Sequence, residues 1–146
     1  MDRFDERILQ ELKLDGRISN VELSERIGLS ASATLRRVQE LEKQGVIKGY
    51  RVITDNTQLG VGFIAYVSIG LASHRKQSQQ EFEDHVRFVD EVVECHNITG
   101  ANEYLLRVET KDLPSYKKFH ADVLGECEHV QSITTMVVMD SPKDER

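Results

Sequence analysis

The segment SNVELSERIGLSASATLRRVQELEKQGVIKGYR, residues 19–51, predicts two helices separated by a tight turn and followed by a short hairpin. Ser19 is a suitable N-cap for the first helix, and Glu22 stands three residues later as its capping-box partner. Gly28 can adopt the positive φ that ends a helix, and Ser30 can cap the next one. This order of elements is typical of a winged helix-turn-helix, a motif that docks on DNA.

The second of these helices, expected over residues 30–44, combines a packed face with a polar face. Leu35, Val38 and Leu41 are predicted to form its apolar stripe. A helix of this kind can enter a major groove. Residues 46–53 after it predict a small β-wing. The residues expected away from the stripe or in the wing, and therefore near DNA, include Ser32, Thr34, Arg36, Arg37, Lys43, Lys48 and Arg51.

The charge distribution favours DNA over plain helix packing, which the same pattern of caps and stripes also serves. Residues 17–51 carry seven basic and four acidic side chains, a net charge of +3. The whole chain has a net charge of −6, so the remaining residues carry −9. Positive charge gathered on one motif of an acidic protein is typical of a local phosphate-binding surface.

Composition limits the remaining classes. The 146 residues suffice for one ordinary domain or two small ones, and 39% of them are hydrophobic. No apolar run approaches the ~20 residues of a membrane span, and the first ten residues, MDRFDERILQ, are charged, so a cytoplasmic protein is predicted. Cys95 and Cys127 fit reduced thiols. No metal or other cofactor is predicted, because paired ligand spacing is lacking among His74, His85, His96, His120 and His129.

The chain is expected to form two domains. Residues 1–53 form the first, in which an opening helix places Phe4, Ile8, Leu9 and Leu12 on one side. Residues 54–61 begin with a polar, turn-prone stretch and are predicted to be an extended connector. Residues 62–146 form the second domain.

The second domain alternates strand and helix patterns. Strands are expected over residues 62–71, 92–98, 104–108 and 130–139, with one helix around Phe82, Val86 and Val89 and another beginning at Leu113. The order β-α-β-β-α-β predicts a ferredoxin-like α+β sandwich with both helices on one face of the sheet. The strands carry Ile, Val and Tyr on both sides, so the uncovered face predicts a homodimer.

Four segments together resemble one family. DGRISNVELSERIGLS, LRRVQELEKQGVIKGY, VVECHNITGANEYLLRVE and the closing TTMVVM are similar to the leucine-responsive regulatory protein/AsnC family of transcription regulators. The resemblance spans residues 4–139. It implies an N-terminal DNA-binding domain, a C-terminal effector domain, double-stranded operator DNA and a small amino acid as partners, and dimers that assemble into tetramers or octamers.

The resemblance also assigns site residues. The recognition helix falls on residues 30–44, where Ala31 and Ala33 replace the two prolines of the family's Ser-Pro-Thr-Pro entry. The family's effector loop falls on residues 99–104. There Ala101 stands where the family more often has an aspartate, and Glu103 is a longer acid than the family's second aspartate. With the pattern above, the expected DNA-contacting residues are Ser30, Ser32, Ala33, Thr34, Arg36, Arg37, Lys48 and Arg51. The expected effector-binding residues are Thr99, Gly100, Ala101, Asn102, Glu103, Val137 and Val138.

A physical reason supports an amino acid at this loop. Gly100 allows backbone amides to approach a carboxylate, and Glu103 offers a charge to an ammonium group. The plain alternative is a hairpin connection with a solvated Glu103. Two other functions stay open: a free-standing amino-acid sensor that does not bind DNA, and an enzyme, for which no nucleophile–base pair stands out. We expect a regulator and not an enzyme.

Overall fold

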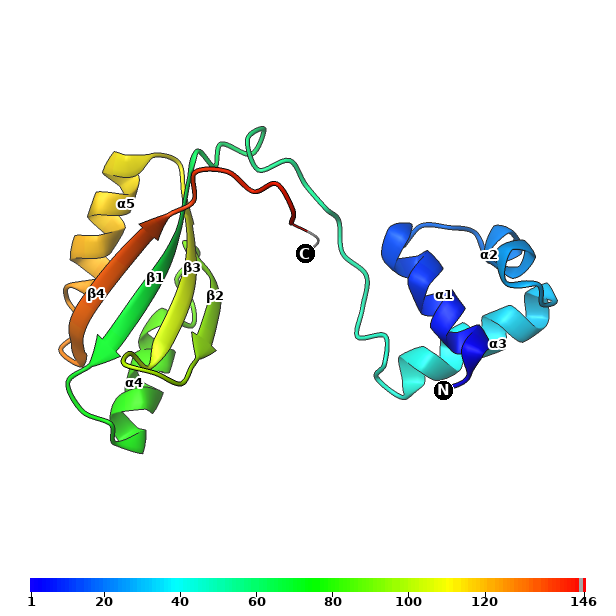
Figure 1. The fold of residues 1–146 in the computed structure, drawn as a ribbon, viewed down its shortest axis with the longest axis horizontal. Helices are drawn as coiled ribbons and strands as arrows, with labels where there is room; N and C mark the ends of the chain where they lie inside the picture. Colours follow the sequence, from blue (N-terminus) through cyan, green and yellow to red (C-terminus); the bar gives the residue numbers. More distant parts are fainter. Residues whose placement is uncertain (145) are drawn as a thin grey trace. The chain divides into compact units, whose positions relative to one another are not determined.

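The computed structural model describes residues 1–144 and 146 and divides into two compact units, Met1–Ile53 and Thr54–Arg146 (Figure 1). The first unit contains three helices, α1 (Arg3–Leu14), α2 (Asn20–Ile27) and α3 (Ala31–Lys43). Their core residues Ile8, Leu23, Ile27 and Leu41 are all at most 3% exposed. The three predicted helices are therefore confirmed, packed around one apolar cluster.

Capping residues, among them the predicted Ser19, Gly28 and Ser30, define where these helices begin and end. Asp2 forms a capping box with Asp5 at the start of α1. The side chains of Ser19 and Ser30 accept backbone N–H groups at the starts of α2 and α3. Gly28 ends α2 with a φ of 82°, a left-handed conformation that glycine adopts without a steric penalty. These local bonds fix the tight turn between α2 and α3.

The predicted β-wing is wrong in this structure. Residues 46–53 contain no strand. The amides of Val46 and Ile47 bond back to the carbonyl of Leu41, which closes α3. Beyond them the segment is extended, with Val52 and Ile53 more than 80% exposed. Two strands of two or three residues each form too few hydrogen bonds to hold a hairpin, which is marginal even at greater length.

The second unit is the predicted ferredoxin-like sandwich. Its strands are β1 (Phe63–Leu71), β2 (Val92–Asn97), β3 (Tyr104–Thr110) and β4 (Val130–Val137), and the helices are α4 (Lys76–Val86) and α5 (Leu113–Phe119), the latter extended by a π-helical turn, η1 (His120–Leu124). All strand pairs are antiparallel, in the order β2-β3-β1-β4. Helices α4 and α5 cover one face of this sheet (Figure 1).

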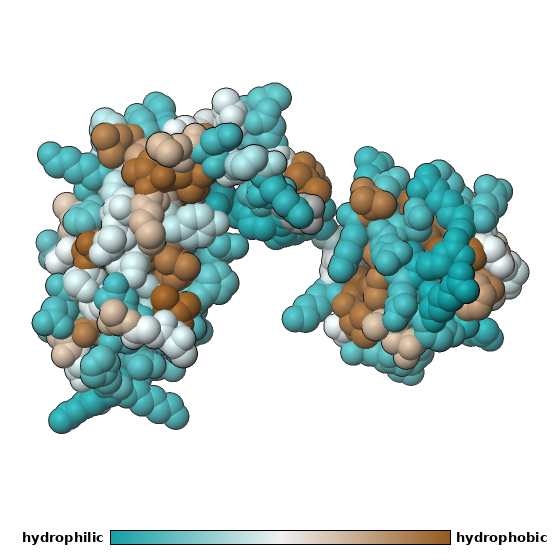
Figure 2. Space-filling model, viewed as in Figure 1, coloured by the Kyte–Doolittle hydropathy of each residue, from teal (hydrophilic) through white to brown (hydrophobic). Residues whose placement is uncertain are grey.

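The two faces of the sheet differ more than the sequence indicated. Alternate residues of β1 and β3, such as Val67, Ile69 and Leu106, are buried against the helices. The opposite face carries Tyr66 and Arg107 as cross-strand neighbours, and Figure 2 shows polar and pale surface there between apolar patches. The open face is therefore mixed and less apolar than expected: Ile64, Leu105 and Met136 stand there among Tyr, Ser, Thr, Arg and Glu side chains.

Residues 54–61 form turns that are anchored to the second unit. Asn56 accepts the amide of Val61 at 2.9 Å, and its side chain donates to the carboxylate of Glu109 at 3.3 Å. The amide of Gly62 reaches the carbonyls of Thr110 and Lys111. The expected extended connector is thus a folded approach to β1. Within residues 1–144 and 146, no helix is long and apolar enough to cross a membrane.

Candidate DNA-binding face and effector loop

The packed face of α3 contains Val38 and Leu41, as expected, but Thr34 in place of Leu35. Thr34 is fully buried, and its hydroxyl donates to the carbonyl of Ser30 at 2.9 Å. Leu35, expected in the stripe, is 46% exposed. The buried line is therefore Thr34, Val38 and Leu41, a spacing of i, i+4 and i+7 that follows the helical period. The assignment of Thr34 to DNA contact is wrong, because its side chain has no exposed surface.

The opposite line of α3 consists of exposed residues at the same spacing. Ser32, Leu35, Arg36 and Gln39 occupy positions i, i+3, i+4 and i+7 and are all exposed. The side chains of Arg36 and Gln39 make no hydrogen bond or ion pair with any residue that the structure describes. We call these four residues the outer face of α3. Leu35 and Gln39 were missed as candidates, although placing Thr34 in the stripe would have revealed them.

Arg37 holds α3 to α1 instead of facing outward. Its Nη1 atom lies 2.9 Å from both Asp2 Oδ2 and Asp5 Oδ1. Its guanidinium also stands 5.4 Å from the ring centre of Phe4. The hydrogen bonds that Arg37 donates to Asp5 and Asp2 raise its pKa. The pKa of Asp2 is lowered, mainly by the backbone amide of Asp5 and also by Arg37. This arginine thus fixes the angle between two helices.

The other basic residues of the motif are likewise either paired within the first unit or exposed to solvent. Arg26 pairs with Glu11 and Glu22 at 2.8 and 2.6 Å. Lys48 and Arg51 are exposed in the irregular segment after α3. Ser30 uses its hydroxyl as the cap of α3 and accepts the amide of Ala33 at 3.1 Å. The positive charge left for a partner therefore lies on Arg36, on the exposed Arg17 and Lys43, and on the segment that follows α3.

The tip of the loop between β2 and β3 is open to solvent. Thr99, Gly100 and Ala101 are exposed, and their amides make no backbone hydrogen bond with a described residue. Gly100 has a φ of 117°, which L-residues rarely adopt, while a Cβ built there would meet nothing within 4 Å. The glycine is therefore needed for the backbone conformation and not for space. Free amides around such a turn can bind a carboxylate.

The base of the same loop is already engaged. One oxygen of Glu103 accepts the amide of Leu71 at 2.7 Å, and the other lies 2.8 Å from His74 Nδ1. The Asn102 side chain donates to Ser68 at 2.7 Å and covers Gly70, where a Cβ would lie 2.7 Å from its oxygen. The side chains of Asn102 and Glu103 thus tie the loop to β1 and to the residues after it.

Val137 and Val138 do not join the loop within one chain. The amide of Val138 bonds to Ile64 at the start of β1. The loop meets β4 near Ser132, five residues before Val137 and so about 16 Å along the strand. The two valines instead line a hollow of about 820 Å³ on the open sheet face, together with Tyr66 and Arg107. Within one chain, the length of β4 therefore separates these two valines from the loop.

Arg107 is the buried charged residue of that hollow, which Asp140, Lys143, Asp144 and Arg146 also line. Its side chain is 3% exposed, and its Nη1 donates to the hydroxyl of Tyr66 at 2.9 Å. Its Nε is buried without a hydrogen-bond partner in the described part of the chain, and Glu109 lies 3.7 Å away. A guanidinium held in this way can bind a carboxylate when one enters the hollow.

Each of the two units matches a known protein-family model. Residues 1–48 match the family model described as winged helix-turn-helix DNA-binding, and residues 64–146 match the Lrp/AsnC ligand binding domain. The chain belongs to the Lrp/AsnC family. It is a DNA-binding transcription regulator with a ligand-binding domain. The match covers the α2–α3 motif and the whole ferredoxin-like sandwich, in the order that the sequence predicted.

Relatives of the Lrp/AsnC family resemble the chain over its full length. The proline dehydrogenase transcriptional activator of Rhizobium radiobacter is 38% identical, covering 99% of this chain and 92% of that protein. The leucine-responsive regulatory protein of Escherichia coli K12 is also 38% identical, covering 98% and 87%. A transcriptional regulator of Neisseria meningitidis, solved in complex with L-Met, has a TM-score of 0.94 at 33% identity, covering 99% and 93%.

Proposed function

We propose that the outer face of α3 reads operator DNA, with Arg36 as its principal base contact. The observation that carries this proposal is the exposed line of Ser32, Leu35, Arg36 and Gln39 on a capped helix of a helix-turn-helix. Arginine forms bidentate bonds to guanine, glutamine to adenine, and an apolar side chain can contact the thymine methyl group. Lys48 and Arg51 supply phosphate contacts beside the groove.

The DNA-binding role is tested with an operator selected from random duplexes by the full-length protein. Arg36→Ala should weaken binding to this operator, measured by fluorescence anisotropy at fixed salt. Arg75→Ala removes the same charge from the N-cap position of α4 in the other unit and is the matched control. A protein that selects no sequence and shows no salt-sensitive binding to random duplex would instead be an amino-acid sensor without DNA binding.

We further propose that the loop of residues 99–103 binds a small amino acid. The exposed amides at its tip face a carboxylate, and Glu103 accepts the ammonium group when His74, whose side chain is 85% exposed, swings away. The regulator of Neisseria meningitidis, whose complex contains L-Met, makes amino acids the first ligands to test.

A thermal-shift screen of the twenty amino acids tests this ligand class. An amino acid present at ~100 times its dissociation constant should stabilise the protein by ~2.7 kcal/mol. The same screen on Arg107→Gln separates the loop from the hollow on the open sheet face. If Arg107→Gln abolishes the response and loop variants keep it, the amino acid binds in the hollow.

We propose that the chain forms a homodimer through the open face of the sheet. We also propose that these dimers assemble into tetramers or octamers in the cytoplasm. Met136, the cross-strand neighbour of Tyr66 on that face, is 46% exposed. A dimer presents two copies of α3 to two half-sites of a pseudo-palindromic operator. Sedimentation of the full chain should show an oligomer, and Met136→Lys should shift it towards the monomer. A wild-type monomer at micromolar concentration would contradict the proposal.

A further inference from the structure

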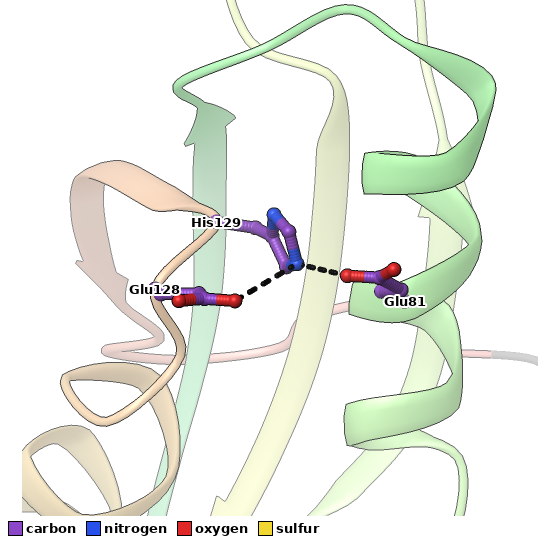
Figure 3. Close-up of side chains that lie close together, drawn as sticks. All are labelled: Glu81, Glu128 and His129. Carbon is purple, nitrogen blue, oxygen red and sulfur yellow. Dashed lines mark hydrogen bonds and ion pairs between the residues drawn. The ribbon is translucent and has the colours of Figure 1, made fainter.

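Three potential metal ligands from two distant parts of the chain converge on the helix-covered side of the second unit (Figure 3). Glu81 lies on α4, while Glu128 and His129 lie just before β4. His129 Nε2 forms a hydrogen bond with Glu81 Oε2 and stands 3.8 Å from Glu128 Oε1. One ligand atom from each residue falls within 4.8 Å of the other two.

The three side chains are held to different degrees. His129 is the central one, 23% exposed, and its carbonyl accepts the amide of Ala72 at 2.9 Å. Glu81 is held on the helix, where Gln77 donates to its other oxygen at 2.9 Å. Hydrogen bonds from Gln77 and His129 lower the pKa of Glu81. Glu128 is 88% exposed and free to turn towards an ion.

One histidine nitrogen and two carboxylate oxygens are donor atoms that suit a divalent metal ion of intermediate softness, such as Zn²⁺. Zn²⁺ binds histidine nitrogen at ~2.0–2.1 Å and carboxylate oxygen at ~2.0–2.2 Å, so ligand atoms of a tetrahedral site lie about 3.4 Å apart. The Glu128–His129 separation needs a small closure, and the Glu81–His129 hydrogen bond must open to admit the ion. We propose that Glu81, Glu128 and His129 bind a divalent transition-metal ion such as Zn²⁺, with solvent as the remaining ligand.

Such an ion would link α4 to the start of β4. The spacing of residues in the sequence does not reveal this site, because Glu81 is 47 residues away from Glu128. A structural consequence follows directly: the bound ion stabilises the ligand-binding domain, since it binds the folded arrangement and not the separated segments. Zinc should therefore raise the melting temperature of the protein.

Calorimetric titration of ZnCl₂ into the full-length chain tests the site. The titrations use a Cys95→Ser background, which removes the exposed thiol. One ion per chain is expected. Glu128→Gln should weaken zinc binding about tenfold or more, in line with the effect of disturbing a metal site, and it cannot impair folding through an 88% exposed side chain. His129→Gln should abolish the binding and the rise in melting temperature.

His96→Gln is the matched control. His96 also lies 3.8 Å from a glutamate, Glu94, but no third ligand joins that pair among the described residues. Its loss should leave the zinc affinity unchanged. Equal affinities of wild type, Glu128→Gln and His129→Gln would overturn the proposal. So would an intense thiolate-to-metal absorption band with Co²⁺, which would assign the ion to Cys127.

Discussion

The outer face of α3 and the loop of residues 99–103 present their functional groups in opposite ways. On α3, the side chains of Arg36 and Gln39 are without partners in the described chain and project from a capped helix. In the loop, the side chains of Asn102 and Glu103 are already bonded, and the free groups are backbone amides. Substitutions on α3 should therefore act through side chains, and those in the loop through backbone conformation.

The largest effect on stability should come from the core residues on the packed side of α3, opposite the outer face. Leu41→Ala empties a core position that is 3% exposed and should cost ~2–5 kcal/mol of unfolding free energy. Leu35→Ala makes the same change on the outer face, where the stability cost should stay within about 0.5 kcal/mol. Urea unfolding measures both. An equal loss of unfolding free energy in the two variants would show that Leu35 belongs to the packed face of α3.

Neighbouring arginines sharpen the difference between the two sides of α3. Arg36→Ala should cost ~1–3 kcal/mol of operator binding if Arg36 contacts guanine, with relaxed specificity at one position. If Arg36 instead contacts a phosphate, the salt slope should fall by about one. Arg37→Ala should chiefly lower the unfolding free energy of the first unit, because Arg37 bonds to Asp2 and Asp5. Anisotropy over a salt series separates these outcomes; a larger binding loss in folded Arg37→Ala would reverse the assignment.

The loop prediction concerns backbone conformation. Gly100→Val forces an L-residue into a φ of 117° and should abolish the effect of the amino acid on operator affinity, a coupling of typically ~1–3 kcal/mol. Operator binding without the amino acid should persist. Thr99→Val replaces a hydroxyl by a methyl group at the neighbouring residue, which has no positive φ, and is the control. A response retained in Gly100→Val would place the ligand elsewhere.

The smallest effect is expected from the charge at the base of the loop. Glu103→Gln keeps an oxygen for the amide of Leu71 and loses the charge facing His74, so the stability cost should be below ~1 kcal/mol. If Glu103 also accepts the ammonium group, the dissociation constant of the amino acid should rise. Thermal unfolding and calorimetry measure the two quantities on the same variant. A large stability loss with unchanged ligand affinity would make Glu103 a purely structural residue.

Local signals in the sequence predicted most of the fold. The caps at Ser19 and Ser30, the glycine at 28 and the strand–helix order of the second domain act over a few residues, so they can be identified without tertiary information. The β-wing failed because a short hairpin needs more hydrogen bonds than its own sequence supplies. The candidate DNA-binding helix was found, and Val38 and Leu41 were placed correctly on its packed face, but Thr34 and Leu35 were exchanged between the inner and outer faces.

The sequence by itself determined that a helix-turn-helix precedes a ferredoxin-like domain, and that α3 carries the candidate contacts. Only the tertiary structure decided which side of α3 is free. One residue rotates a helix by about 100°, so Thr34 and Leu35 point to different sides, and the packing of α3 against α1 and α2 selects between them. The same packing brings Asp2 and Asp5 to Arg37, a contact across more than thirty residues that no local pattern encodes. Long-range contacts of this kind follow from how whole elements pack, and for that reason they also decided the convergence of Glu81 with His129.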